Sequence, residues 1–294
     1  MKKYQHYIPR VYLKFFTISN EQFKSKVFCI DLSDKQHIDI LIKGVNDKVF
    51  KKKNYYNDYR FRDKEALENM FADEFENKFH FMMKEIEKEK ILNKELLQCL
   101  ISWLYISKMR SPIHRERIES FLDLYLKVDS HLNKDETSIE NIRKQHSLKK
   151  SISKEFHLNI FYDVNFMENN VKKFVNTVIS KHWSILKANT TLQFITNDNP
   201  GFSPNLIRQS EYFSSYDLNF YSEIYYVLSP TYCLHIKPFD SGTNPHVNAY
   251  NMDILFRTAS ENEIRYINKG VFNTAYRLLI SKSCDLLKPF LSLS

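Results

Sequence analysis

The chain has 294 residues, of which 43% are apolar and 15% aromatic, and its formal net charge is +8. This length is enough for one large domain or two small ones, and for a substantial core. The four glycines lie far apart in the sequence, whereas phosphate-binding loops need several glycines close together. The composition therefore excludes a P-loop, a dinucleotide-binding fingerprint and a glycine-rich kinase loop, and we expect no nucleotide cofactor.

Compartment and partners are constrained by hydropathy, cysteine usage and charge. No run of about 18 apolar residues is present, and the start, MKKYQHYIPR, lacks the apolar core of a secretory signal. We therefore expect a cytoplasmic protein without a membrane partner. The four cysteines form no C-x-x-C pair and are expected to be reduced thiols. The positive charge favours contact with nucleic acid or anionic lipid, although an AT-rich genome gives the same excess of lysine.

The first 110 residues are predicted to form two strands followed by two helices. The stretches 26–31 and 36–42 have the composition of short strands joined by a turn. Between 64 and 89, apolar residues recur at spacings of three and four, which predicts one long helix. Its apolar stripe contains Leu67, Phe71, Phe75, Phe79, Met82 and Ile86. A second helix is expected over 94–110, where Arg-Ser-Pro ends it because the residue before a proline disfavours the helical conformation.

The middle of the chain is predicted to be mainly helical. Helices are expected over 113–132, 137–149 and 168–188. The stretch 133–155 is polar and charged, and we expect it to be an exposed hinge or an insertion within a single domain.

The last third is predicted to return to strands before a final helix. A strand that leads into a turn is expected over 191–200, and two strands that flank a Ser-Pro turn are expected within 221–230 and 231–238. The final helix is expected over 260–282, where Ser260 as N-cap and a glutamate three residues later match a capping box. The expected fold is therefore α+β, with a helical middle of about five to six helices and short antiparallel strands from the N- and C-terminal parts.

Two candidate catalytic groups lie in the first third of the chain. His6, within the aromatic stretch QHYIPRVYLKFF, suits a general base or a metal ligand. Alternatively, it hydrogen-bonds to the backbone while its aromatic neighbours pack. Glu68, Ala72, Glu76 and His80 form one row at i, i+4 spacing beside the apolar stripe. Such a row suits a divalent ion such as Mg or Mn, or it is a solvated acidic face.

A third candidate group lies in TNDNPG, where a strand ends in an acidic turn. Asp198 and Asn199 suit a catalytic aspartate with a neighbouring polar ligand, but they equally suit a turn in which both side chains cap their own backbone. A restriction-type nuclease would also need Glu-x-Lys on the next strand, and EIYY at 223–226 does not supply it.

Basic and aromatic residues provide candidate phosphate ligands. Arg110 suits bidentate binding of phosphate, or it caps the C-terminus of its own helix. Lys52, Lys53 and Tyr55 belong to a basic patch with interleaved aromatic residues, which is typical of single-stranded nucleic-acid binding. The alternative for this patch is a solvated loop.

Several stretches, in this order, resemble a bacterial family known as domain of unknown function 4238. They are HYIPRVYLKFF, RSP, WSILKANTTLQFITNDNPGF, LSP and INKGVFNTAYRLLIS. The resemblance extends from His6 to about Ser281, with a departure at Asn197, where serine is usual. It implies a shared fold without a settled activity, and we expect a nuclease or toxin-like effector in bacterial defence.

The leading hypothesis is a phosphodiesterase of the nuclease kind that acts on RNA or DNA. The expected catalytic residues are His6, Glu68, Glu76 and Asp198. A divalent metal would be held by Glu68, Glu76 and Asp198. Substrate would be bound by Arg110, Asn199, Lys52, Lys53 and Tyr55. The alternative is a non-enzymatic nucleic-acid-binding or protein-interaction subunit of a defence or toxin system, and convergence of these residues in one place separates the two.

Overall fold

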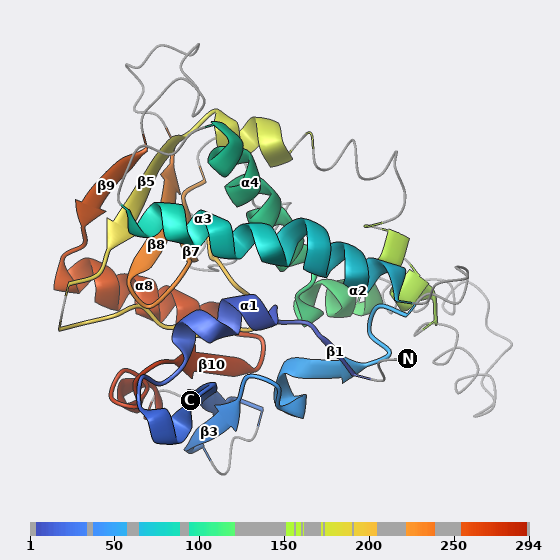
Figure 1. The fold of residues 1–294 in the computed structure, drawn as a ribbon, viewed down its shortest axis with the longest axis horizontal. Helices are drawn as coiled ribbons and strands as arrows, with labels where there is room; N and C mark the ends of the chain where they lie inside the picture. Colours follow the sequence, from blue (N-terminus) through green and yellow to red (C-terminus); the bar gives the residue numbers. More distant parts are fainter. Residues whose placement is uncertain are drawn as a thin grey trace, which may run out of the picture.

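The structure is a computed structural model in which helices form the middle of the chain and strands form both ends (Figure 1). The described residues are 4–33, 38–57, 65–88, 94–120, 151–155, 157–159, 161, 172, 174–189, 191–204, 222–238 and 254–292. The predicted α+β class is confirmed. The predicted helix 137–149 lies outside the described residues, as do most of the stretch 133–155 and the second half of helix 113–132.

The aromatic N-terminal segment is anchored in the core. Strand β1 (Tyr4–His6) pairs antiparallel with β4 (Lys51–Lys53), and helix α1 (Arg10–Leu13) follows directly. The Tyr12 side chain is buried, and its hydroxyl group lies 2.6 Å from both Thr196 Oγ1 and the carbonyl oxygen of Val227. Residues 4–16 are therefore tied to strands that are distant in the sequence.

The first four-stranded sheet joins the two ends of the chain. Its strands are β3 (Ile40–Gly44), β2 (Lys26–Asp31), β10 (Leu278–Ser281) and β6 (Thr196–Asn197), in this order. Strand β10 is antiparallel to both of its neighbours. The predicted helix 260–282 was thus too long, because its last residues form this central strand. Strand β3 begins later than the predicted strand 36–42.

The second four-stranded sheet includes a segment that was predicted to be helical. Its order is β7 (Ile224–Val227), β8 (Tyr232–Lys237), β5 (His182–Lys187) and β9 (Leu255–Thr258). The predicted helix 168–188 was wrong at its end, since the helical residues stop at 179. Hydrogen bonds from β8 on one side and β9 on the other hold this segment as a strand, and short apolar runs fit either state.

The long helix predicted over 64–89 is confirmed within its described part, but it is not regular. It consists of α2 (Ala66–Met70), a π-helical turn (Phe71–Glu76) and α3 (Asn77–Glu87). The wide turn shifts the apolar face, so Phe71 and Phe79 are buried whereas Phe75 is only partly buried. The Phe79 ring stacks on Trp103 of α4 (Lys94–Met109), with ring centroids 3.8 Å apart.

Helix α8 (Glu261–Thr274) contacts both four-stranded sheets (Figure 1). The predicted N-cap is confirmed, because Ser260 Oγ accepts a hydrogen bond from the Glu263 amide. The Glu263 carboxylate binds Arg257 instead of completing the capping box. A Cβ atom at Gly270 would lie 2.3 Å from the Phe202 ring, so this close approach requires glycine. None of the described helices is both long and apolar enough to cross a membrane.

Candidate active site

Arg110, in the Arg-Ser-Pro motif, links this motif to the N-terminal segment and to the helical segment that carries Glu76. Its guanidinium group is buried and donates hydrogen bonds to the carbonyl oxygen of His6 at 2.8 Å and to Glu76 Oε1 at 3.0 Å. The remaining nitrogen, Nε, contacts the Tyr56 hydroxyl at 3.3 Å, and the group lies 4.4 Å from the centre of the Phe71 ring. All three nitrogen atoms thus have internal partners, which favours a structural role over phosphate binding for Arg110.

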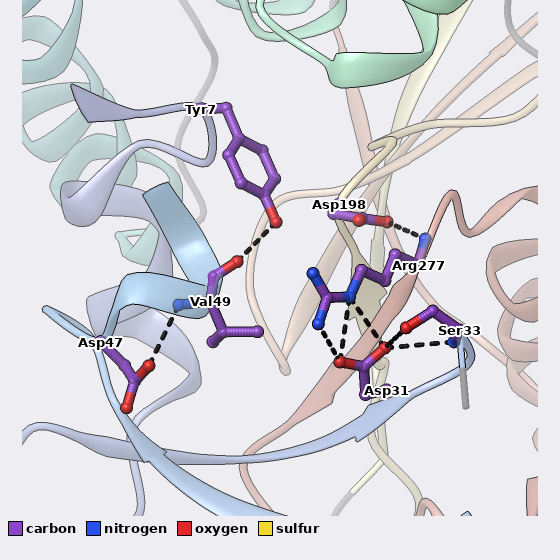
Figure 2. Close-up of polar contacts among 7 residues, drawn as sticks. All are labelled: Tyr7, Asp31, Ser33, Asp47, Val49, Asp198 and Arg277. Atoms are coloured by element: carbon purple, nitrogen blue, oxygen red, sulfur yellow. Dashed lines mark hydrogen bonds and ion pairs between the residues drawn. The ribbon is translucent and has the colours of Figure 1, made fainter. Parts of the chain in front are cut away.

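Asp198 occupies a buried turn and joins β6 to the start of β10. Its Oδ1 atom accepts a hydrogen bond from the amide of Tyr276 at 2.9 Å. It also accepts one from the amide of Arg277 at 3.0 Å, which is drawn in Figure 2. Its Oδ2 atom is buried and has no hydrogen-bond partner among the described residues. Burial raises the pKa of Asp198 to about 6, although the backbone hydrogen bonds act in the opposite direction.

The surroundings of Asp198 include the polar side chains of Tyr7, Asp31 and Arg277 (Figure 2). Arg277 forms an ion pair with Asp31, with Nε at 2.8 Å from Oδ1. Burial opposes ionisation of Asp31, but hydrogen bonds from Arg277 and Ser33 lower its pKa to about 2. Burial and the nearby Asp198 carboxylate both raise the pKa of Tyr7, whose hydroxyl donates to the carbonyl oxygen of Val49 at 2.7 Å.

Asn199 is fully engaged in holding the turn. Its amide nitrogen donates to the carbonyl oxygen of Thr274 at 2.9 Å, and its Oδ1 atom accepts from Lys108 Nζ at 2.5 Å. The hydroxyl of Ser111, next to Arg110, contacts both Asn199 Oδ1 and the Asp198 carbonyl oxygen. These contacts support the alternative in which the turn is structural.

His6 and Asp198 do not contact each other through any hydrogen bond or ion pair found in the described part of the chain. The His6 Nδ1 atom is buried without a hydrogen-bond partner. Burial lowers the pKa of His6 to about 4, and the charges of Lys51 and Arg110 add to this effect. His6 is therefore held in its neutral form. Its neighbour Tyr7, rather than His6, lies close to Asp198.

The predicted basic patch is divided between exposed and half-buried residues. Lys53 is exposed, whereas Lys52 is half-buried, with its ammonium group 5.3 Å from the Tyr276 ring centre and 5.8 Å from that of Tyr55. Burial lowers the pKa of Lys52, while the nearby Glu116 carboxylate opposes this change. Tyr55 is itself fully buried, so it offers no exposed ring on which a nucleic-acid base could stack.

A groove of about 530 Å³ lies between the N-terminal segment and the irregular helix. One wall comes from α1 and the turn after it, and the other from the π-helical turn and α3, which run side by side (Figure 1). The lining residues are Arg10, Val11, Lys14, Phe15, Ala72, Glu76, Asn77 and His80. The groove thus includes three of the four positions in the predicted i, i+4 row.

Charges of both signs face each other across this groove. Arg10 and Lys14 are exposed, and their side chains have no acidic partner among the described residues. On the opposite wall, Glu76 is 21% exposed with Oε1 bound to Arg110, and His80 is exposed one helical turn further on. Arg10 and Lys14 were not predicted from the sequence, because the aromatic residues around them indicated only burial. Their spacing of four nevertheless places both on one exposed face.

Glu68, the remaining predicted acidic ligand, is partly buried and is not among the residues that line the groove. The π-helical turn between it and Glu76 interrupts the regular i, i+4 row. Within the described ranges, no group of three or more His, Cys, Asp or Glu side chains is arranged to hold a metal ion. Glu68, Glu76 and Asp198 thus do not form one ligand set, and a divalent metal stays a prediction.

The fold and the groove define an α+β protein with a charged, solvent-accessible candidate site. The sequence profile of the family described as "Protein of unknown function (DUF4238)" matches residues 4–285. The chain therefore belongs to this family, which confirms the resemblance of its motifs. No curated protein matches the chain, and no solved structure matches it.

Proposed function

We propose that the protein is a phosphodiesterase of the nuclease kind and that it acts in the groove between α1 and α3. The observation that carries the proposal is that two cations without an acidic partner in the described part of the chain, Arg10 and Lys14, face a carboxylate and an imidazole on the opposite wall. Arginine and lysine suit the binding of a phosphodiester. Glutamate and histidine suit the transfer of protons to and from its oxygen atoms.

The support of Glu76 by Arg110 suits a catalytic role for this carboxylate. Arg110 is held by Tyr56 and by the His6 carbonyl oxygen, so it fixes the position of Glu76 Oε1. Glu76 Oε2 makes no hydrogen bond to a described residue and is available to accept a proton. A reactive group held by buried neighbours loses little entropy when the substrate binds. Glu76 also ends a π-helical turn, a feature that is frequent at functional sites.

The motif residues His6 and Asp198 then support the site from behind. The carbonyl oxygen of His6 accepts a hydrogen bond from Arg110 and so helps to position it. The carbonyl oxygen of Asp198 accepts a hydrogen bond from Ser111, which follows Arg110 in the sequence. Of the predicted catalytic residues, only Glu76 lines the groove. A supporting role for His6 and Asp198 explains why their motifs nevertheless lie close to it. In a bacterial cell, such an activity would suit a defence or toxin system.

Cleavage of labelled single-stranded oligonucleotides by the purified chain tests this function. We expect Glu76→Gln and His80→Gln each to reduce the rate by about 10²–10⁴-fold, the usual contribution of a proton-transfer group. Because His80 is exposed, His80→Gln should leave the melting temperature unchanged. The matched control is Glu87→Gln, which changes an exposed carboxylate of the same helix outside the groove and should retain full activity.

The same variants separate the enzyme from its alternatives. Binding of oligonucleotides without cleavage by the parent chain would favour a nucleic-acid-binding subunit, and absence of binding would favour a protein-interaction subunit. In cells, growth inhibition on induced expression should be relieved by His80→Gln but not by Glu87→Gln. Equal inhibition by both variants would count against a catalytic toxin.

A further inference from the structure

We infer that the substrate of the groove is single-stranded RNA and that the nucleophile is the RNA's own 2′-hydroxyl group. This inference rests on the proposed function and specifies its substrate. It follows from three features of the groove: its size, the number of carboxylates in its lining, and the placement of its proton-transfer groups.

The size of the groove favours a single strand. A volume of about 530 Å³ is that of a site for a small ligand, so it accommodates about one nucleotide unit rather than a double helix. Arg10 and Lys14 lie one helical turn apart and can bind phosphates of one strand. Phe15 also lines the groove, and the centroids of the Phe15 and His80 rings are 6.4 Å apart. Stacking on aromatic side chains is the usual way in which unpaired bases are bound.

The lining residues favour an internal nucleophile over activated water. Nucleases that use metal ions to activate water hold these ions with several oxygen ligands. Of the described residues that line the groove, Glu76 alone carries a carboxylate. The 2′-hydroxyl of RNA is already next to the reacting phosphorus atom, so its attack requires only a base, an acid and cations. DNA lacks this hydroxyl group.

The reaction is a transesterification in which Glu76 and His80 exchange protons with the substrate. Glu76 Oε2 accepts the proton of the 2′-hydroxyl, and the 2′-oxygen forms a bond to phosphorus. The bond between phosphorus and the 5′-oxygen breaks, and protonated His80 donates its proton to that leaving oxygen. Arg10 and Lys14 stabilise the additional negative charge on the phosphate. The products are a 2′,3′-cyclic phosphate and a 5′-hydroxyl, and no water is consumed.

The two groups are placed suitably for one phosphodiester. Residues four apart in a helix have Cβ atoms about 5–6 Å apart. Glu76 immediately precedes α3, and His80 lies four residues later in its first turn. Arg110 holds one oxygen of Glu76, whereas His80 is exposed and free to adjust to the leaving group. The carboxylate and the imidazole can therefore serve the attacking and leaving oxygens of the same phosphate.

The test compares three oligonucleotides of one sequence: RNA, DNA, and RNA with 2′-O-methyl groups throughout. We expect all three to bind, and only the unmodified RNA to be cleaved, with rates on the other two lower by at least about 10³-fold. Mass spectrometry should find 2′,3′-cyclic phosphate ends on the products. Glu76→Gln and His80→Gln should reduce formation of these ends, while Glu87→Gln should not.

The outcomes distinguish the inference from the function on which it rests. Cleavage of DNA at a rate similar to that of RNA, or RNA products with 5′-phosphate ends, would overturn the 2′-hydroxyl mechanism and leave the phosphodiesterase in place. If none of the three oligonucleotides is cleaved, the proposed function and the inference both fail.

Discussion

Asp198 is a buried carboxylate whose two oxygen atoms have different environments. Oδ1 accepts two backbone hydrogen bonds at the start of β10, and Oδ2 has no partner within the described part of the chain. An acid that is buried in this way favours its protonated form. The stability of the protein should therefore depend on the protonation of this residue.

We expect Asp198 to make the free energy of unfolding fall as the pH rises. Its pKa of about 6 in the folded chain exceeds the ordinary value of 3.8. The folded state thus binds the proton more tightly, and the stabilisation is fully present below about pH 4 and is lost as the pH rises through 6. Asp198→Asn still accepts both amide hydrogen bonds and does not titrate. Relative to the parent, this variant should gain about 2–3 kcal/mol between pH 4 and pH 7.

Urea unfolding of both chains at several pH values measures this difference. Asp73→Asn, at an exposed position, is the control and should show no such gain. A difference between Asp198→Asn and the parent that is constant with pH would show that folding does not shift the pKa of Asp198. A difference that increasingly favours the parent at higher pH would show that the folded chain stabilises the ionised carboxylate.

Residues of the candidate site were only partly predictable from the sequence. Glu76 was predicted from its i, i+4 row, because helical periodicity is a local property. The role of Asp198 depends on the amides of Tyr276 and Arg277, which are distant in the sequence and become neighbours only in the fold. Arg10 and Lys14 were missed because a buried aromatic segment can still present a charged face.

At the scale of secondary structure, the helical run across 66–87 shows what periodicity reveals and what it leaves out. The spacing of apolar residues predicted the helix correctly, but a π-helical turn makes no separate signal in such a pattern. The additional residue in that turn rotates Phe75 partly out of the core, while Phe79 remains buried against Trp103.

We expect Phe79→Ala to be much more destabilising than Phe75→Ala. Removal of a buried phenylalanine leaves a cavity, and the cost should be about 3–5 kcal/mol. Phe75 is partly exposed to solvent, and its loss should cost less than about 2 kcal/mol. Denaturant unfolding of the two variants measures both values. Equal costs would mean that the π-helical turn does not shift the apolar face.

The strands at 182–187 and 278–281 were predicted as helix because the spacing of apolar residues is ambiguous in short segments. Each is a short apolar run whose spacing suits either structure, and each is fixed as a strand by two neighbouring strands. By contrast, the strands at 224–227 and 232–237 were predicted well, because a local turn joins them. Elements whose partners are close in sequence are therefore the predictable ones.

At the scale of the whole molecule, the net charge of +8 bears on the affinity for nucleic acid. We expect binding to a labelled 2′-O-methyl oligonucleotide to weaken steeply as salt is raised from about 50 to 200 mM, because bound phosphates release counterions. Each phosphate contact on a single strand contributes a log–log slope of about −0.7. The double variant Arg10→Gln, Lys14→Gln should therefore make the slope less negative by about 1.4.

Fluorescence anisotropy over this salt range gives both slopes. Lys24→Gln, Lys53→Gln, which also removes two exposed cations, is the control and should retain the parent slope if phosphates bind in the groove. A slope that changes only in this control would place phosphate binding at Lys24 or Lys53 rather than in the groove. Binding that is independent of salt would exclude phosphates as the main contact.

The position of β10 has a consequence for how the protein is made. Because β10 lies between β2 and β6, the first sheet cannot be completed on the ribosome until residue 281 has left the exit tunnel. Until then, β2 and β3 can form only a hairpin, in which the edge of β2 that β10 later covers is unpaired. Two-stranded hairpins are marginally stable, and open edges pair readily with other chains. The nascent chain should therefore be a substrate for chaperones until β10 closes the sheet, whereas the hairpin of β7 and β8 can form as soon as it emerges.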